Sequence, residues 1–475
     1  FVLLERFEQA GDAEATIGLT TSLYSLLQYV GKPRLLERVG QVRDAAAAAL
    51  GETWNHAQFD SQRTRIEQQL AGGGLRDAFD GAEQLLQRAR TAGENAYPGA
   101  DYDLAIACFL LARVLNTAGG SEQALPLLDE AQERFEEVER NRPGRGAARM
   151  ASLCFEERGH CLLSLGLLDE AGAAYEECVR RADELGDDRE VAVGKGQLGA
   201  VRLQQRRYPE ALDAYQEARE RFTELDEPGS VAASWHQTGM VHQKAGQPDA
   251  AEDAYRKSLA IEVRQGNVAG QADTLGQLGG LYLQVLDRPE EAVAFFRQAA
   301  DKYVEIGDLA GEGRQRNNVA ETFRKLGRLD ESRQEIHRAL ECKEGLGHAS
   351  EPWTSWFILA NIETDAGYPA AAADAKQKAI ECYLAYRRDG GENHFPDGRI
   401  CLAVTQALLT EGPDAATTLL QPLAEDPDAA LLLPFIQALQ AVVSGSRDRT
   451  LADAPELDCT MAAEILFLIE TLEKE

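Results

Sequence analysis

A small residue recurs about every 40 positions through the middle of the chain, and this periodicity restricts the fold more than any other feature. Four glycines are each separated by 40 residues: Gly159, Gly199, Gly239 and Gly279. With small insertions, or one longer step backwards, the series extends to Ala320, Ala360 and Ala112. A period of about 20 to 50 residues is typical of a protein that stacks one structural unit on the next.

Other positions keep a constant offset from these anchor residues. Twelve residues after an anchor the side chain is usually small, and four residues further it is large, as at Ala171 and Tyr175. Apolar positions fall at helical spacing on both sides of a turn, so each unit is predicted to be two amphipathic helices. The small anchor lets the two helices approach closely, and the large residue fills the gap between one hairpin and the next. The turn often contains a glycine that ends the first helix: Gly119, Gly166, Gly246, Gly327 and Gly367.

The composition supports an all-helical chain. Hydrophobic residues make up 44% and proline occurs at only 16 positions, whereas strong helix formers such as Ala, Leu, Glu, Gln and Arg are abundant. Alternating stretches rich in Val, Ile and Thr are almost absent, which predicts little or no β-sheet.

The chain is strongly acidic, with 49 Lys and Arg against 79 Asp and Glu and a net charge of −30. This balance argues against nucleic acid or an anionic membrane as the main partner. Two interpretations stay open: a solvated acidic exterior, or an acidic groove that steers a basic ligand. The sequence has no apolar stretch of about 18 residues and no signal-peptide pattern, so we expect no membrane span and a cytoplasmic location.

The eight cysteines are scattered and none forms a C-x-x-C pair. Buried thiols in a reducing cytoplasm are therefore expected, and not a zinc ribbon or a redox motif. Cys154 and Cys161 are seven residues apart on one predicted helix, which favours core packing over shared metal ligation.

The repeat resembles the tetratricopeptide family, whose signature places a small residue eighth, Ala twentieth, an aromatic residue near the twenty-fourth position and Ala near the twenty-seventh. The usual repeat has about 34 residues, and this one has 40. It is similar to the longer repeats of kinesin light chains, of bacterial peptide-sensing regulators and of the sensor arms of bacterial signal-transduction NTPases. The resemblance implies an all-α, right-handed superhelical solenoid of about nine to ten hairpins with a C-terminal helical cap. We expect divergent repeats over 1–99, seven regular repeats over 100–392, and an irregular repeat with capping helices over 393–475.

No catalytic motif is present: the sequence lacks a P-loop, an H-E-x-x-H pair, a G-x-S-x-G elbow and a dinucleotide fingerprint. VGKGQ, residues 193–197, falls inside a predicted first helix, and His236 and His242 are six apart, on different helix faces. We therefore expect no enzyme activity, no cofactor and no metal.

In the tetratricopeptide family the first helix of each unit lines the concave, ligand-facing surface. Two residues before successive anchors lie Glu157, Gln197, Gln237, Gln277, Asn318 and Ile358. An amide can pair with both the N–H and the C=O of an extended peptide. Kinesin light chains carry Asn-Asn at this place, which Asn317 and Asn318 reproduce, so the resemblance implies that Asn318 clamps a ligand backbone. The alternative is that glutamine is simply a good helix former on a polar face.

Further predicted ligand-binding residues on this surface are His160, His236, Lys244, Arg314, Arg324, Lys325 and Asn361. Arg314, Arg324 and Lys325 form a basic cluster that suits a carboxylate or a phosphate. The alternative is ordinary ion pairing with Glu321, Asp330 and Glu331.

The expected function is binding of a peptide or protein segment. Because the chain begins at Phe1 without a Met, we expect the sensing or scaffolding arm of a larger cytoplasmic bacterial signalling protein. The alternative is a stand-alone peptide-sensing regulator of the quorum-sensing type, although nothing basic or helix-turn-helix-like precedes the repeats. An enzyme with an unconventional groove site finds no supporting cluster of titratable residues.

Overall fold

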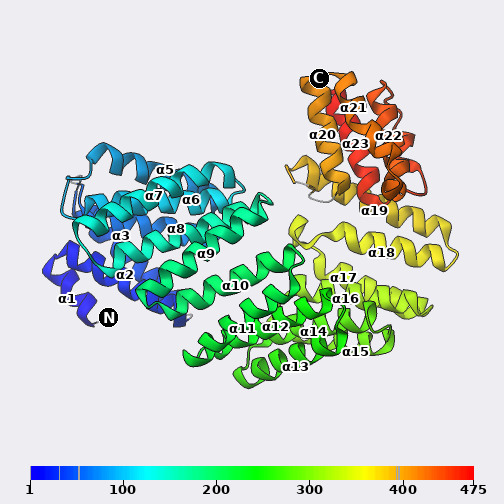
Figure 1. Cartoon of the computed structure of the whole chain (residues 1–475). Coiled ribbons are helices and arrows are strands. Elements are labelled where there is room, and N and C mark those ends of the chain that lie inside the picture. The colour runs from blue at the N-terminus through cyan, green and yellow to red at the C-terminus, as the bar shows by residue number, and fades with distance from the viewer. Residues whose placement is uncertain (1, 31–32, 52–53, 392, 394–395, 475) are drawn as a thin grey trace. The chain divides into compact units, whose positions relative to one another are not determined.

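The computed structural model describes residues 2–30, 33–51, 54–391, 393 and 396–474, and in this part of the chain it contains helices and no strand (Figure 1). The predicted all-α solenoid of stacked hairpins is confirmed. The chain divides into two compact units, Phe1–Ala245 and Gly246–Glu475. The predicted three-part division into 1–99, 100–392 and 393–475 stays a prediction.

Unit 1 consists of consecutive helices that pack as antiparallel pairs. Its helices are α1 (Val2–Ala10), α2 (Ala13–Val30), α3 (Pro33–Ala49), α4 (His56–Ala71), α5 (Leu75–Ala92), α6 (Ala100–Thr117), α7 (Ser121–Asn141), α8 (Arg145–Ser164), α9 (Leu168–Leu185), α10 (Asp188–Gln204), α11 (Tyr208–Glu224) and α12 (Pro228–Lys244). The sequence indicates two weaker repeat units here, one with Tyr24 and Leu36 in register and one with Ile66, Gly73 and Ala78. These residues fall in the helix pairs α2–α3 and α4–α5. Gly31, which the sequence places in register with Tyr24 and Leu36, lies outside the described residues.

Unit 2 continues the hairpins and ends in a more irregular group of helices. Its helices are α13 (Pro248–Gln265), α14 (Val268–Gln284), α15 (Pro289–Ile306), α16 (Leu309–Lys325), α17 (Leu329–Lys343), α18 (Pro352–Asp365), α19 (Pro369–Arg388), α20 (Pro396–Thr410), α21 (Pro413–Glu425), α22 (Leu433–Val443) and α23 (Cys459–Glu473). Short 3₁₀ turns cover Gly347–Ser350, Pro427–Leu432 and Arg449–Asp453. From the sequence, residues 446–460 are predicted to form a loop and the last helix to begin at Met461. The last of the 3₁₀ turns lies inside this segment, and α23 begins two residues earlier because the Asp458 side chain accepts hydrogen bonds from the backbone N–H groups of Thr460 and Met461.

The anchor glycines allow an aromatic ring to lie directly on the first helix of its own hairpin. A Cβ added to Gly159 would lie 2.6 Å from ring carbons of Tyr175, and one added to Gly279 would lie 2.5 Å from the ring of Phe296. Tyr175 also shares a buried cluster with Val201 of α10, the contact between hairpins that the repeat predicted. A side chain at Gly159 or Gly279 would displace the ring from its contact with the first helix and from its packing in the core.

The predicted turn glycines have the left-handed backbone that ends a helix, with φ between 71° and 84° at Gly119, Gly166, Gly246, Gly327 and Gly367. The α10–α11 turn reaches the same region without glycine, because Arg206 has φ of 60°. The repeat geometry therefore overrides the local preference of this residue.

The cap of unit 2 is formed by α23, which packs against α19 and α20. Glu464 of α23 is completely buried and receives hydrogen bonds from Tyr383 Oη at 2.9 Å and Asn393 Nδ2 at 3.1 Å. Arg387 Nε lies 3.0 Å from the same carboxylate oxygen, at ion-pair distance but without hydrogen-bond geometry. A buried polar cluster thus attaches the last helix to the repeats.

Candidate binding surface

The residues two places before each anchor lie along neighbouring first helices, and we call the surface that they mark the first-helix face. First helices pack on one another within each unit, as α6 does on α8, α10 on α12, and α16 on α18. In unit 1 this face carries Glu157, Gln197 and Gln237, all half-buried. In unit 2 it carries half-buried Gln277, exposed Asn318 and half-buried Ile358.

In unit 2 the amides of Gln277 and Asn318 are accompanied by a third amide. Asn318 Nδ2 donates to Gln315 Oε1 at 3.2 Å. Gln315 is largely buried and reaches α14, since a Cβ added to Gly276 would lie 2.9 Å from its Nε2. Gln315 was not singled out from the sequence, although a residue three places before Asn318 lies on the same side of a helix. The side chain of Gln277 makes no hydrogen bond to the described residues.

Asn317 has a structural role. Its side chain is buried, its Oδ1 accepts a hydrogen bond from Ser355 Oγ at 2.8 Å, and its Nδ2 donates to Thr354 Oγ1 at 3.4 Å. Asn317 and Asn318 therefore have different environments, because adjacent residues on a helix point about 100° apart. Asn317 joins α16 to α18, while Asn318 faces outward.

In unit 1 the α8 end of the first-helix face is charged. Glu157 Oε1 lies 3.3 Å from Arg113 Nε of α6, and its other oxygen lies 3.8 Å from His160 Nδ1. Interaction with Glu157 raises the pKa of His160. Burial, together with the negative charge of Glu190, raises the pKa of the neighbouring Glu156 to about 7. His160 is thus held by Glu157 at this face.

The remaining predicted residues of unit 1 lie on α10 and α12. Gln197 and Gln237 are half-buried, and their side chains have no hydrogen-bond partner in the described part of the chain. His236 is half-buried and interacts with other residues. Lys244 is exposed at the end of α12.

A model of the tetratricopeptide repeat matches residues 148–224, 190–262 and 230–303, three overlapping windows that begin in α8 and end in α15. This stretch of the chain, residues 148–303, contains tetratricopeptide repeats. They coincide with the hairpins whose anchors are the four glycines spaced by 40 residues. Repeats of this family serve mainly as binding and scaffolding modules.

Several solved structures are similar to this chain. BtubC from P. vanneervenii is 23% identical, with 49% of this chain and 92% of that chain covered and a TM-score of 0.43. The apo quorum sensor NprR from B. thuringiensis is 10% identical, with 78% and 99% covered and a TM-score of 0.49. A signal transduction ATPase with numerous domains and a tetratricopeptide repeat sensor, from Pyrococcus horikoshii, is 12% identical, with 82% and 67% covered and a TM-score of 0.47. None of the curated proteins matches this chain.

On α16, the predicted basic cluster is partly neutralised. Arg324 pairs with Glu321 at 2.8 Å and with Asp365 at 2.6 Å, and these contacts raise its pKa. Asp330 and Glu331, the other proposed partners, pair with Arg333 and Arg328 instead. Arg314 and Lys325 are exposed and make no ion pair with the described residues, and half-buried Asn361 follows the α18 anchor.

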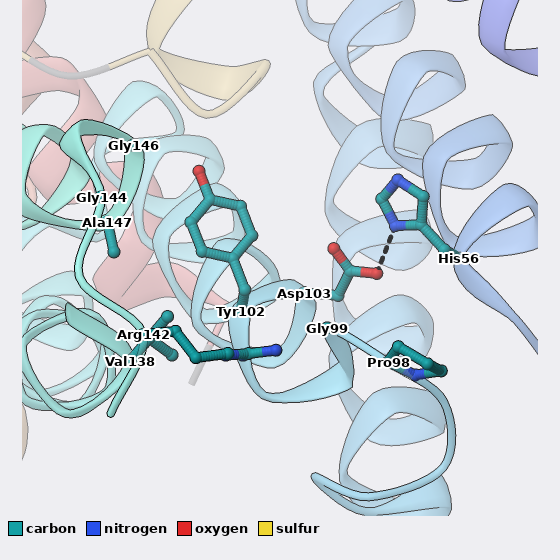
Figure 2. A pocket seen from close by; sticks show the side chains of 10 residues that line it. All are labelled: His56, Pro98, Gly99, Tyr102, Asp103, Val138, Arg142, Gly144, Gly146 and Ala147. Carbon is teal, nitrogen blue, oxygen red and sulfur yellow. Dashed lines mark hydrogen bonds and ion pairs between the residues drawn. The ribbon is translucent and has the colours of Figure 1, made fainter. Parts of the chain in front are cut away.

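A separate pocket lies where α4 and α6 meet the start of α8 (Figure 2). It has a volume of about 380 Å³. His56 Nδ1 lies 2.7 Å from Asp103 Oδ2, and the Tyr97 hydroxyl donates to the same oxygen at 2.8 Å. The His56–Asp103 pair links α4 to α6, and the hydrogen bond to Asp103 raises the pKa of His56.

Of the described helices, none combines the length and hydropathy needed to cross a bilayer.

Replacing His56 with glutamine should destabilise the protein more at pH 5 than at pH 8. The folded-state pKa of His56 is raised. Protonated His56 therefore adds its full contribution to the free energy of unfolding below the unfolded-state pKa of about 6.5, and this contribution is lost as the pH rises through the folded-state pKa. The ring is 66% exposed, so solvent screening limits the effect to about 1 kcal/mol or less. Urea unfolding of both proteins between pH 5 and 8 measures this difference, and a difference independent of pH would contradict it.

Proposed function

We propose that the first-helix faces of this tetratricopeptide protein bind an extended segment of a peptide or protein. The observation that carries the proposal is a pair of amides on successive first helices, half-buried Gln277 on α14 and exposed Asn318 on α16, with Gln315 bonded to Asn318. Amides offer donors and acceptors that match a peptide backbone whatever its sequence. Gln197 and Gln237 offer the same groups in unit 1.

Exposed charges add selectivity to this surface. Arg314 and Lys325 flank Asn318 on α16 and suit acidic groups of a ligand. His160, His236, Lys244, Arg324 and Asn361 border the same faces, and the ion pairs of Arg324 leave it a secondary role.

In its biological setting, the chain is proposed to be the sensing or scaffolding arm of a larger cytoplasmic bacterial signalling protein. The sequence supports a binding role because the repeats form an uninterrupted array and contain no catalytic motif. A stand-alone peptide-sensing regulator is the alternative. The complete reading frame distinguishes the two, since an attached ATPase or effector domain supports the arm and its absence supports the regulator.

Loss of two amides should weaken ligand binding. Peptides selected from a randomised display library against the whole chain provide the probe, and calorimetry measures their affinity. We expect Gln277→Ala/Asn318→Ala, or Gln197→Ala/Gln237→Ala for ligands of unit 1, to raise Kd about thirtyfold, since each of the two lost hydrogen bonds contributes about 1 kcal/mol.

The matched control is Gln298→Ala, which removes an exposed amide from the second-helix position of α15. It should leave Kd unchanged. Unaltered affinity in both double variants, with helical content intact, would remove the first-helix faces as the binding surface. Turnover of a substrate that is abolished by one substitution there would point to an enzyme instead.

A further inference from the structure

A polar cavity near the N-terminus lies apart from the first-helix positions discussed above. It is bordered by α2, α3 and α4 and has a volume of about 480 Å³. Its polar lining includes Tyr24, Gln41, Arg43, Arg65, Gln68 and Gln69. Guanidinium groups, amides and a phenol together provide many hydrogen-bond donors.

Arg43 is the unusual member of this lining, because it is a buried cation with few partners. The residue is only 1% exposed. Its Nη2 donates to Gln68 Oε1 at 3.2 Å. Nε and Nη1, both buried, have no hydrogen-bond partner among the described residues. Such a group is costly in a folded protein unless an anion or other acceptors reach it.

The carboxylates that the structure describes do not satisfy this guanidinium. The nearest is Asp44, at 3.7 Å from Nη2, and its side chain is 62% exposed. Glu37 lines the cavity but is exposed, and Asp60 is engaged by Arg63 at 2.6 Å. Burial accordingly outweighs these charges and lowers the pKa of Arg43.

We propose that this cavity binds a small oxyanion, a carboxylate or a phosphate, through Arg43. Oxyanions accept the planar N–H donors of a guanidinium and form short, charge-assisted hydrogen bonds with it. Arg65 is exposed at the same cavity and supplies a second positive charge for the approach. Gln68 fixes the orientation of Arg43, and the amides of Gln41 and Gln69 offer further N–H donors.

The test measures thermal unfolding of the whole chain with increasing sodium phosphate or sodium acetate, at ionic strength matched with sodium chloride. We expect the Tm to rise and saturate with one of the two anions, by about 1 to 3 °C at ten times Kd. Phosphate and acetate arms distinguish the two classes of oxyanion. Isothermal calorimetry with the same anion should give one site per chain.

Arg43→Met should abolish the saturable shift while keeping a similar side-chain volume, and it should fold at least as well as the native chain because it removes an unpaired buried charge. Arg65→Gln should weaken anion binding several-fold without abolishing it. Arg76→Met, which changes an exposed arginine of α5, is the control and should behave as the native chain does. The proposal is overturned if neither anion gives a saturable shift, or if Arg43→Met retains the full shift.

Discussion

Glu464→Ala is expected to lower the free energy of unfolding of the C-terminal cap by about 3 to 5 kcal/mol, the usual cost of removing one partner of a buried ion pair. Glu464 is completely buried, and one of its oxygens meets Tyr383, Asn393 and Arg387. Without the carboxylate, Arg387 would be left with a side chain that is 10% exposed and without its counter-ion. We expect the stability to be lost where α23 packs against α19 and α20.

Hydrogen exchange measured by mass spectrometry checks this expectation segment by segment. Peptides from α19, α20 and α23 should exchange much faster in Glu464→Ala, whereas α14 and α16 should change little. Glu473→Ala removes a half-exposed carboxylate of the same helix that pairs with Arg449, and it should cost less than about 1 kcal/mol. Equal protection of the cap in Glu464→Ala and the native chain would show that the buried cluster does not hold α23.

Gly279→Ala is expected to destabilise unit 2 by about 2 kcal/mol, the cost of overfilling a packed contact. The new Cβ would lie 2.5 to 2.9 Å from three carbons of the Phe296 ring, which is 3% exposed and cannot move into solvent without losing its packing. Thermal unfolding followed by circular dichroism measures the effect as a lower Tm.

The adjacent glycine provides the control. Gly280 lies on the same helix, and a Cβ added there meets no atom within 4 Å. Gly280→Ala should therefore stabilise α14 by about 0.5 to 1 kcal/mol through helix propensity. The two alanine variants should differ by about 3 kcal/mol, and equal Tm values would contradict the role of Gly279 as a packing anchor.

The fold was predictable because its determinants are local and repeat. Each hairpin contact has its own mark in the sequence: a glycine every 40 residues, a ring sixteen residues after Gly159, and a glycine at the turn. Because these marks repeat, the pattern is easy to recognise. The turn at Arg206 and the start of α23 at Cys459 were harder to predict from the sequence, because each depends on neighbours that do not repeat. The division after Ala245 has no signal in composition or spacing.

The candidate surface was predictable only in part. Helical geometry and family resemblance placed Gln277 and Asn318 correctly on adjacent first helices, although their binding role stays a prediction. They did not reveal that Asn317 bonds to Ser355, that Gln315 reaches α14, or that Asp365 takes up Arg324. These partners lie up to about 40 residues away in sequence, so only the stacking of one hairpin on the next brings them together.

The cysteines differ in burial, so thiol labelling can measure the local opening of individual helices. Cys108, Cys154, Cys161 and Cys178 are all buried in unit 1, whereas Cys342 and Cys382 of unit 2 are only half-covered. A thiol reagent should therefore label the native protein first on α17 and α19, slowly because burial raises the pKa of both thiols. Later labelling of each remaining cysteine would then time the opening of its own helix, without any added reporter group.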